Sequence, residues 1–326
     1  MKPIQEKILI NGYFGNSNFG DELILSLKLK ELDRNNTDII VASSNPGETR
    51  KRYNVKCFRK FNPFSLLWYT IRCNTLIFPG GGIFQDETSF LSLMYYVSHI
   101  ITARIFGKTV KLERISVGPI IRKFSTRLIE IGLKNCKISV RDENSLIILR
   151  ALGITGYIPI LPDRVYDLDL SPRTPERNKF IIGIQLRQWR NIEQIIPVLQ
   201  RLLNEWLLKY NNLEFHLLEF QETDRNVLNK LKGSLPGDSS RIIGGIDNLL
   251  TEYAILDFII GMRFHSILIA DRMDIPLFGI AYAPKCLDLL EKHRSKFIDL
   301  NDFDLNYFEK RLRAEFEEEY KKKFNL

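Results

Sequence analysis

The chain has 326 residues, of which 44% are hydrophobic and 26% are charged. This ordinary composition excludes wholesale disorder, a collagen-like repeat and a disulfide-stapled mini-protein, and the length suggests two domains. Lys and Arg outnumber Asp and Glu by 47 to 39, which gives a net charge of +8 and favours anionic partners.

The four cysteines, Cys57, Cys73, Cys136 and Cys286, lie far apart and form no CxxC pair. Zinc-ribbon and thioredoxin-like sites are therefore excluded, and a reducing cytosol is the simplest setting. The most apolar segment, residues 90–106, contains a histidine and an arginine, so we expect no membrane span. The first ten residues lack a signal-peptide core. We expect a cytoplasmic protein with at most peripheral contact at the inner face of the membrane.

Short apolar runs alternate with longer helical patterns along the chain. The first half has predicted strands at residues 7–11, 38–42, 75–79, 108–117 and 136–140. A proline-containing, charged stretch at 167–179 predicts a linker, and further strands follow at 180–186, 214–219, 241–243, 256–260 and 276–280. Strand–turn–helix units in series predict an α/β fold with two Rossmann-like domains. Residues 301–326 predict a charged helix on the solvated surface.

Two glycine-rich stretches follow predicted strands, at the sheet edge where α/β proteins bind ligands. In GYFGNSNFGDE, Asp21 either caps the next helix or meets a ligand, and the free N–H groups of that helix suit an anion. The stretch is neither a P-loop nor GxGxxG, and tight turning alone also explains it. In FPGGGIFQDE, Gly81 and Gly82 permit close backbone approach to a ligand, whereas Asp86 is also explained as a helix cap.

Cationic residues follow other strands. Arg141 comes directly after the strand ending at residue 140, where a guanidinium is suited to clamp a carboxylate or phosphate; a surface pair with Asp142 is the equal alternative. The densest group is Arg263 and His265 after one strand and Lys285 after the next. A lone histidine is usually structural, but His265 is accompanied by an arginine and a lysine, which favours an anion-binding site.

These stretches together resemble the polysaccharide pyruvyl transferase family. The matching pieces, in family order, are GYFGNSNFGDELIL, FPGGGIFQDE, VGPI, SVRDENS, PD, IGIQLRQW, GMRFHSILIA and IAYAPK, over residues 10–290. The resemblance implies a GT-B-like architecture, two Rossmann-like domains facing a central cleft. It also implies transfer of pyruvate from phosphoenolpyruvate to a sugar of a cell-surface polysaccharide or its precursor, with formation of a cyclic ketal.

The resemblance implies roles for particular residues. Arg141, Arg263 and His265 are expected to be catalytic, and these three with Phe264 and Lys285 are expected to bind phosphoenolpyruvate. The expected domains are residues 1–168, with the acceptor side and Arg141; residues 169–300, with the phosphoenolpyruvate side; and the helix at 301–326. The donor is itself a substrate, and no cofactor and no metal are expected.

The acceptor, a sugar that is free or lipid-linked, is expected against the N-terminal domain. Its predicted contacts are Asn18, Asp21, Gly81, Gly82, Asp86 and Trp189. Asp21 and Asp86 are candidate hydroxyl binders or bases, and Trp189 either stacks on the sugar or is an ordinary core or surface tryptophan.

Two departures from the family pattern bear on the acceptor. The stretch before GP is LERISVGP, with Glu113, Arg114 and Ile115, and an arginine, Arg164, follows the PD pair.

Ketal formation requires a proton at the methylene carbon of the donor, and His265 is the candidate acid. A helix N-terminus disfavours its imidazolium form by roughly 0.3–1 kcal/mol. A bound phosphate about 4 Å away favours that form by a few kcal/mol, so we expect His265 to gain its proton when the donor binds.

Other functions also remain open. The nearest alternative is a GT-B glycosyltransferase that uses a nucleotide-sugar donor. A family member that binds the donor without transferring it is another. The charge of +8 also suggests a non-enzymatic binder of nucleic acid or anionic membrane, but positive residues occur along the whole chain, and no nucleic acid is expected as a partner.

Overall fold

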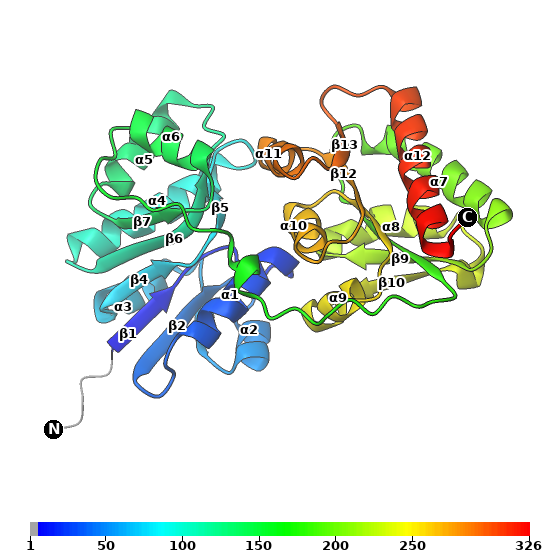
Figure 1. Cartoon of the computed structure of the whole chain (residues 1–326). Coiled ribbons are helices and arrows are strands. Elements are labelled where there is room, and N and C mark those ends of the chain that lie inside the picture. Colours follow the sequence, from blue (N-terminus) through cyan, green and yellow to red (C-terminus); the bar gives the residue numbers. More distant parts are fainter. Residues whose placement is uncertain (1–5) are drawn as a thin grey trace. The chain divides into compact units, whose positions relative to one another are not determined.

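Strands and helices alternate along the chain in the computed structural model, which describes residues 6–326 (Figure 1). The chain divides into unit 1, residues 1–168, and unit 2, residues 169–326. The first five residues of the expected N-terminal domain lie outside the described residues. Each unit contains one parallel sheet with helices packed on it, so the predicted α/β class with two Rossmann-like domains is confirmed. No helix within residues 6–326 is long and apolar enough to cross a membrane.

The described part of unit 1, residues 6–168, holds seven strands. They are β1 (Glu6–Ile10), β2 (Thr37–Ser43), β3 (Lys56–Arg59), β4 (Thr75–Phe78), β5 (Gly81–Phe84), β6 (Thr109–Val117) and β7 (Lys137–Val140). Its helices are α1 (Phe19–Glu31), α2 (Pro46–Tyr53), α3 (Pro63–Arg72), α4 (Phe90–Ile105), α5 (Lys123–Leu133) and α6 (Glu143–Ala151), with a 3₁₀ turn η1 (Arg164–Asp167). The sequence did not predict β3, which has a charged residue at each end, or β5, which begins with two glycines.

The sheet of unit 1 has the strand order β3-β2-β1-β4-β6-β5, and β7 pairs with the other edge of β6. Side chains alternate between its two faces, as the two-residue period of a strand requires. On β1, Ile8 and Ile10 join a cluster with α1 and α2, whereas Leu9 joins a larger cluster with α4 and α5. Because the strands are parallel, their carboxyl ends all meet at one edge of the sheet.

Unit 2 contains six strands. They are β8 (Phe180–Gln185), β9 (Leu213–Glu219), β10 (Ser240–Gly244), β11 (Phe258–Gly261), β12 (Leu277–Ala281) and β13 (Lys296–Asp299), in the order β10-β9-β8-β11-β12-β13. Its helices are α7 (Ile192–Lys209), α8 (Arg225–Lys232), α9 (Ile246–Tyr253), α10 (Phe264–Arg272), α11 (Pro284–Lys292) and α12 (Leu305–Phe324), with 3₁₀ turns η2 (Glu222–Asp224) and η3 (Gly237–Ser239). The sequence did not predict β13.

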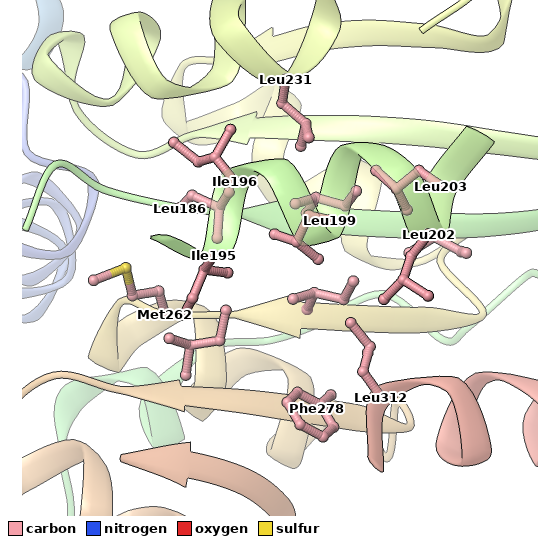
Figure 2. Close-up of a cluster of buried hydrophobic side chains, with 14 of the residues drawn as sticks. Leu186, Ile195, Ile196, Leu199, Leu202, Leu203, Leu231, Met262, Phe278 and Leu312 are labelled. Carbon is pink, nitrogen blue, oxygen red and sulfur yellow. The ribbon is translucent and has the colours of Figure 1, made fainter. Parts of the chain in front are cut away.

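The core of unit 2 lies between one face of this sheet and helices α7, α8 and α12. Figure 2 shows Ile195, Leu199 and Leu202 of α7 above Phe278 of β12, with Leu312 of α12 closing the layer. All five side chains are fully buried. This packing fixes the strands whose carboxyl ends carry Arg263 and Lys285.

The C-terminal helix α12 differs from the solvated helix that its charges predicted. Phe308, Leu312, Phe316 and Tyr320 recur every four residues and form a buried stripe, because that spacing returns to the same face of a helix. The ring of Phe316 stacks on Trp206 of α7 with centroids 3.9 Å apart. Residues 301–326 are therefore part of the core of unit 2, with only the opposite face in solvent.

Candidate functional site

In unit 2, three neighbouring strands, β8, β11 and β12, end together. Gln185 is the last residue of β8 and is fully buried, and its Oε1 accepts a hydrogen bond from the backbone N–H of Arg263 at 2.6 Å. Its backbone carbonyl accepts another from Met262 at 3.1 Å. These bonds fix the turn between β11 and α10, which carries the residues predicted to bind the donor.

The guanidinium of Arg263 is held by a buried carboxylate. Its Nε and Nη2 donate to the two oxygens of Asp224 at 2.8 and 2.5 Å, and Nη2 also donates to Gln221 at 3.0 Å. Burial raises the pKa of Asp224, and Arg263 opposes that rise. The pair fixes the orientation of Arg263 but balances its charge, so Arg263 attracts an anion less strongly than the sequence suggested.

Phe264, His265 and Lys285 adjoin Arg263 at the same sheet edge. Phe264 and His265 are the first two residues of α10, both half-buried, with ring centroids 5.3 Å apart. The ammonium of Lys285, an exposed residue in the first turn of α11, lies 5.9 Å from the Phe264 ring. The structure thus brings together the four unit 2 residues predicted to bind phosphoenolpyruvate, next to the N-termini of two helices.

A further arginine at this edge lies against a pair of aromatic rings. The guanidinium of Arg187 lies 4.8 Å from the Trp189 ring and 4.7 Å from the Tyr282 ring, and the two rings are 4.9 Å apart. Cation–π contact of this kind holds a guanidinium in place. Arg187 was not predicted as a site residue, although its place directly after the predicted strand at 180–186 was the available signal. Trp189, predicted to contact the acceptor, therefore packs beside the donor-binding candidates of unit 2.

In unit 1, Arg141 is in a buried ion pair. Its side chain is 4% exposed, and its Nη1 lies 2.7 Å from Asp163, whereas Asp142 is 3.9 Å away. Its Nε donates to Ser116 at 2.6 Å. The pair with Asp142 considered from the sequence is present only as this longer contact, because Asp142 caps α6. The main partner of Arg141 is the buried Asp163. Arg141 and Arg263 thus share one arrangement, a guanidinium fixed after a strand end by an aspartate.

The predicted acceptor residues Asn18, Asp21 and Gly81 are neighbours. Asn18, not Asp21, caps α1, accepting from the N–H groups of Gly20 and Asp21. Gly81 has φ +93, and a side chain there would come within 3.3 Å of the Asp21 carboxylate. Glycine is required at this position by its backbone and by that carboxylate. Gly82 follows within β5 and is half-buried.

Asp86 is bonded to the start of α5. It is 1% exposed, and its carboxylate accepts hydrogen bonds from the backbone N–H groups of Ile121 and Arg122 and from the Ser125 hydroxyl. These bonds lower its pKa against the opposing effect of burial. The helix cap considered from the sequence was misplaced, because Ser89 caps α4 and Asp86 supports the start of α5.

A buried polar network holds the turn after β1. Asn11 accepts from the N–H of Gly12 at 2.8 Å through Oδ1, which directs its Nδ2 to His99 Nδ1 at 2.7 Å. His99 Nε2 then lies 2.8 Å from Thr70 Oγ1, which donates to the Leu66 carbonyl. Burial lowers the pKa of His99 to about 3. His99 is therefore neutral, with its proton on Nε2.

Lys60 is a candidate that the sequence did not reveal. It is 2% exposed, and its ammonium lies 5.0 Å from the Tyr13 ring and 5.1 Å from the Phe61 ring. Burial lowers its pKa to about 8, and the charge of Asp21 opposes that shift. An amine with this pKa is partly neutral near physiological pH and can accept a proton. The sequence around Lys60, including its neighbour Phe61, does not indicate that this lysine is buried. Its burial depends on Tyr13 and Tyr96, which lie elsewhere in the sequence.

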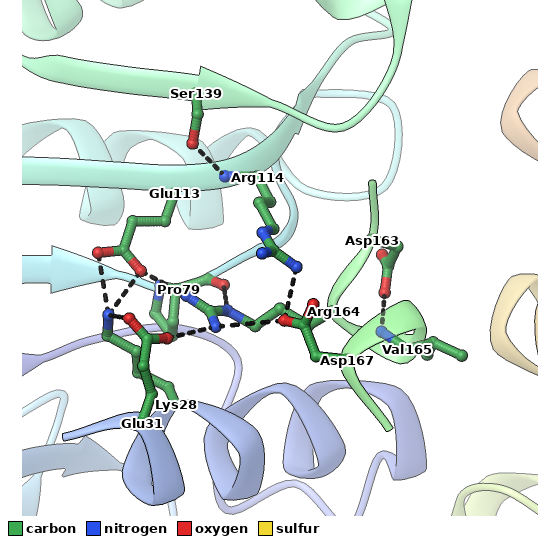
Figure 3. A network of polar contacts seen from close by, with 10 residues as sticks. All are labelled: Lys28, Glu31, Pro79, Glu113, Arg114, Ser139, Asp163, Arg164, Val165 and Asp167. Carbon is green, nitrogen blue, oxygen red and sulfur yellow. Dashed lines mark hydrogen bonds and ion pairs between the residues drawn. The ribbon is translucent and has the colours of Figure 1, made fainter. Parts of the chain in front are cut away.

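The two departures from the family pattern contact each other. Figure 3 shows Arg164 reaching Glu113 and Glu31, each at 2.6 Å, while Lys28 lies 2.8 Å from Glu113. Arg164 and Lys28 are almost fully buried. The positive charge of Arg164, after the PD pair, therefore compensates for the negative charge of Glu113, before GP.

The first departure also includes Arg114, which is paired within unit 1. Its Nη1 lies 2.6 Å from Asp167 (Figure 3). These changes connect η1 to β6 and α1, and none of the charged groups concerned needs an acceptor to explain it. No group of three or more His, Cys, Asp or Glu side chains within residues 6–326 is arranged to hold a metal ion.

Comparison with known families identifies the family of the chain. The family model described as polysaccharide pyruvyl transferase matches residues 18–284. The chain belongs to the polysaccharide pyruvyl transferase family. The match includes every predicted site residue except Lys285, and it makes the chain a transferase that acts on polysaccharide.

Solved structures show the fold of this family member. It is similar to Anabaena Alr3699/HepE in complex with UDP-glucose (TM-score 0.63, 11% identity, covering 97% of this chain and 91% of that one). It is also similar to a putative UDP-N-acetylglucosamine 2-epimerase from Listeria monocytogenes (0.62, 10%, 96% and 88%) and to Acinetobacter baumannii MurG (0.55, 10%, 95% and 90%). The GT-B-like fold is thereby confirmed. None of the curated proteins matches the sequence.

Proposed function

We propose that this protein transfers the pyruvate group of phosphoenolpyruvate to a sugar of a cell-surface polysaccharide or its precursor. The methylene carbon of the donor gains a proton, and a sugar hydroxyl attacks the adjacent carbon as its bond to phosphate breaks. A second hydroxyl of the same sugar closes the ketal. Of the two hydroxyl protons released, one balances the proton now in the methyl group and the other leaves on phosphate.

The observation that supports the donor most strongly is the gathering of Arg263, Phe264, His265 and Lys285 at one sheet edge. Phosphoenolpyruvate carries a carboxylate and a phosphate on one carbon, so it needs several fixed donors. Lys285 and the first turns of α10 and α11 offer positive charge. Arg263 supplies a guanidinium whose orientation Asp224 has already fixed.

His265 is proposed as the acid because it lies in the first turn of α10 beside Arg263. Arg141, buried against Asp163, contributes as a fixed cation at the end of β7. On the acceptor side, Asp21 and Gly81 are proposed to meet the sugar. Lys60 is proposed as the base that draws a proton from its hydroxyl, since burial has lowered its pKa.

The test is incubation with phosphoenolpyruvate and a panel of glycans, free and lipid-linked. Release of inorganic phosphate together with a pyruvyl mass gain on one glycan is the expected result. His265→Gln should abolish both signals. The matched variant His293→Gln alters the C-cap residue of α11, which pairs with Asp271 near the end of α10, and it should keep both signals. Transfer at the wild-type rate by His265→Gln would remove the proposed acid.

A GT-B glycosyltransferase with a nucleotide-sugar donor is the second candidate. It is favoured by the UDP-glucose held by the similar Anabaena protein. A ligand raises the melting temperature in proportion to its occupancy of the folded state, so the two donors can be compared directly. Stabilisation by phosphoenolpyruvate and none by UDP-sugars is expected, and the reverse pattern would favour the glycosyltransferase.

A further inference from the structure

Helix α3 in unit 1 exposes an apolar stripe to solvent. Phe64, Leu67, Trp68 and Ile71 follow the i, i+3, i+4, i+7 spacing of one helical face, and all four are exposed, Phe64 by 84% and Trp68 by 54%. The inward face already packs through Leu66 and other side chains on the core. Helix α3 therefore has apolar residues on both faces, and exposure of the outer face to water is unfavourable.

The stripe continues beyond α3. Phe61, just before the helix, is 65% exposed and contacts Tyr95 of α4 with ring centroids 5.3 Å apart. The first turns of α4 add exposed Leu91 and Met94. Helices α3 and α4 also contact each other directly. We call this surface, made of Phe61, Phe64, Leu67, Trp68, Ile71, Leu91 and Met94, the α3–α4 face.

The face carries positive charge and no acid on its own helices. Helices α3 and α4 contain two arginines, Arg72 and Arg104, and no Asp or Glu. The first acid after α3, Asp86, is buried as a support for α5. Beside the stripe, Arg72 covers the Trp68 ring, 3.0 Å from its centroid.

We propose that the α3–α4 face docks on a membrane surface that contains anionic lipids. Apolar side chains with tryptophan and phenylalanine enter the acyl boundary, while Arg72 beside Trp68 attracts the headgroups. The aliphatic Leu67, Ile71 and Leu91 favour lipid over nucleic acid, because only planar rings stack on bases. A second copy of the chain is disfavoured, because two faces of the same positive charge would repel.

The decisive experiment is vesicle sedimentation of the whole protein, and it requires no transfer activity. The wild type should sediment with vesicles of phosphatidylcholine and phosphatidylglycerol, less with pure phosphatidylcholine, and less at high salt. F64S/W68S should reduce the partition coefficient by at least about tenfold. The matched control L208S/Y157S alters two other residues that are about nine-tenths exposed and should sediment like the wild type.

A spectroscopic readout places the face at the bilayer. Trp68 fluorescence should shift to shorter wavelength on binding and be quenched by brominated lipid. Trp68→Phe should lose that signal while still sedimenting. The proposal is overturned if the wild type does not sediment, if F64S/W68S sediments like the control pair, or if brominated lipid leaves Trp68 unquenched. It is equally overturned if F64S/W68S leaves vesicle binding intact and instead abolishes dimer formation or the binding of duplex DNA.

Discussion

Mild acid should destabilise unit 1 through one residue, His99. The imidazole is almost fully buried, and its Nδ1 faces the NH₂ group of Asn11, so a second proton would meet a donor. Burial lowers the pKa to about 3 in the folded protein, against about 6.5 in the unfolded chain. Between these values only the unfolded chain takes up the proton, so the stability contributed by His99 is lost as the pH falls below about 6.5.

The magnitude follows from linkage. At pH 5 the unfolded chain is about 1.5 pH units below its histidine pKa, which corresponds to about 2 kcal/mol lost relative to neutral pH. Urea denaturation at pH 7 and pH 5 measures this loss for the wild type and for His99→Gln. The other histidines are common to both proteins and cancel in the comparison. The variant should lose about 2 kcal/mol less, and equal losses would refute the assignment of His99 as buried and neutral.

Three further predictions concern the ion pairs and the core. Arg164→Met should cost about 3 kcal/mol in urea denaturation because it leaves carboxylates facing each other, and adding Glu113→Gln should recover part of that loss; no recovery would contradict the pairing. Phe316→Ala should destabilise unit 2 by about 3–5 kcal/mol, whereas Glu318→Ala on the outer face of α12 should stay within about 0.5 kcal/mol. Arg263→Lys keeps the charge but loses the fork, so the rise in melting temperature with phosphoenolpyruvate should shrink; an undiminished rise would show that orientation by Asp224 is unnecessary.

The sequence by itself determined the fold class and most of the strands. Of the thirteen strands within residues 6–326, ten were predicted within about two residues of their bounds, because an apolar run between turns is a local signal that packing preserves. It also placed Arg263, His265 and Lys285 at one sheet edge, since parallel strands in series send their carboxyl ends the same way. The family motifs were likewise contiguous stretches that need no knowledge of contacts.

Only the tertiary structure decided which charges pair. Asp224 lies 39 positions from Arg263, and Asp163 lies 22 from Arg141, and nothing in the spacing selects those partners from the other carboxylates. Burial is equally a property of assembled elements. The lowered pKa of Lys60 requires rings from separate segments, because desolvation arises only when packing removes water from every side of a charge.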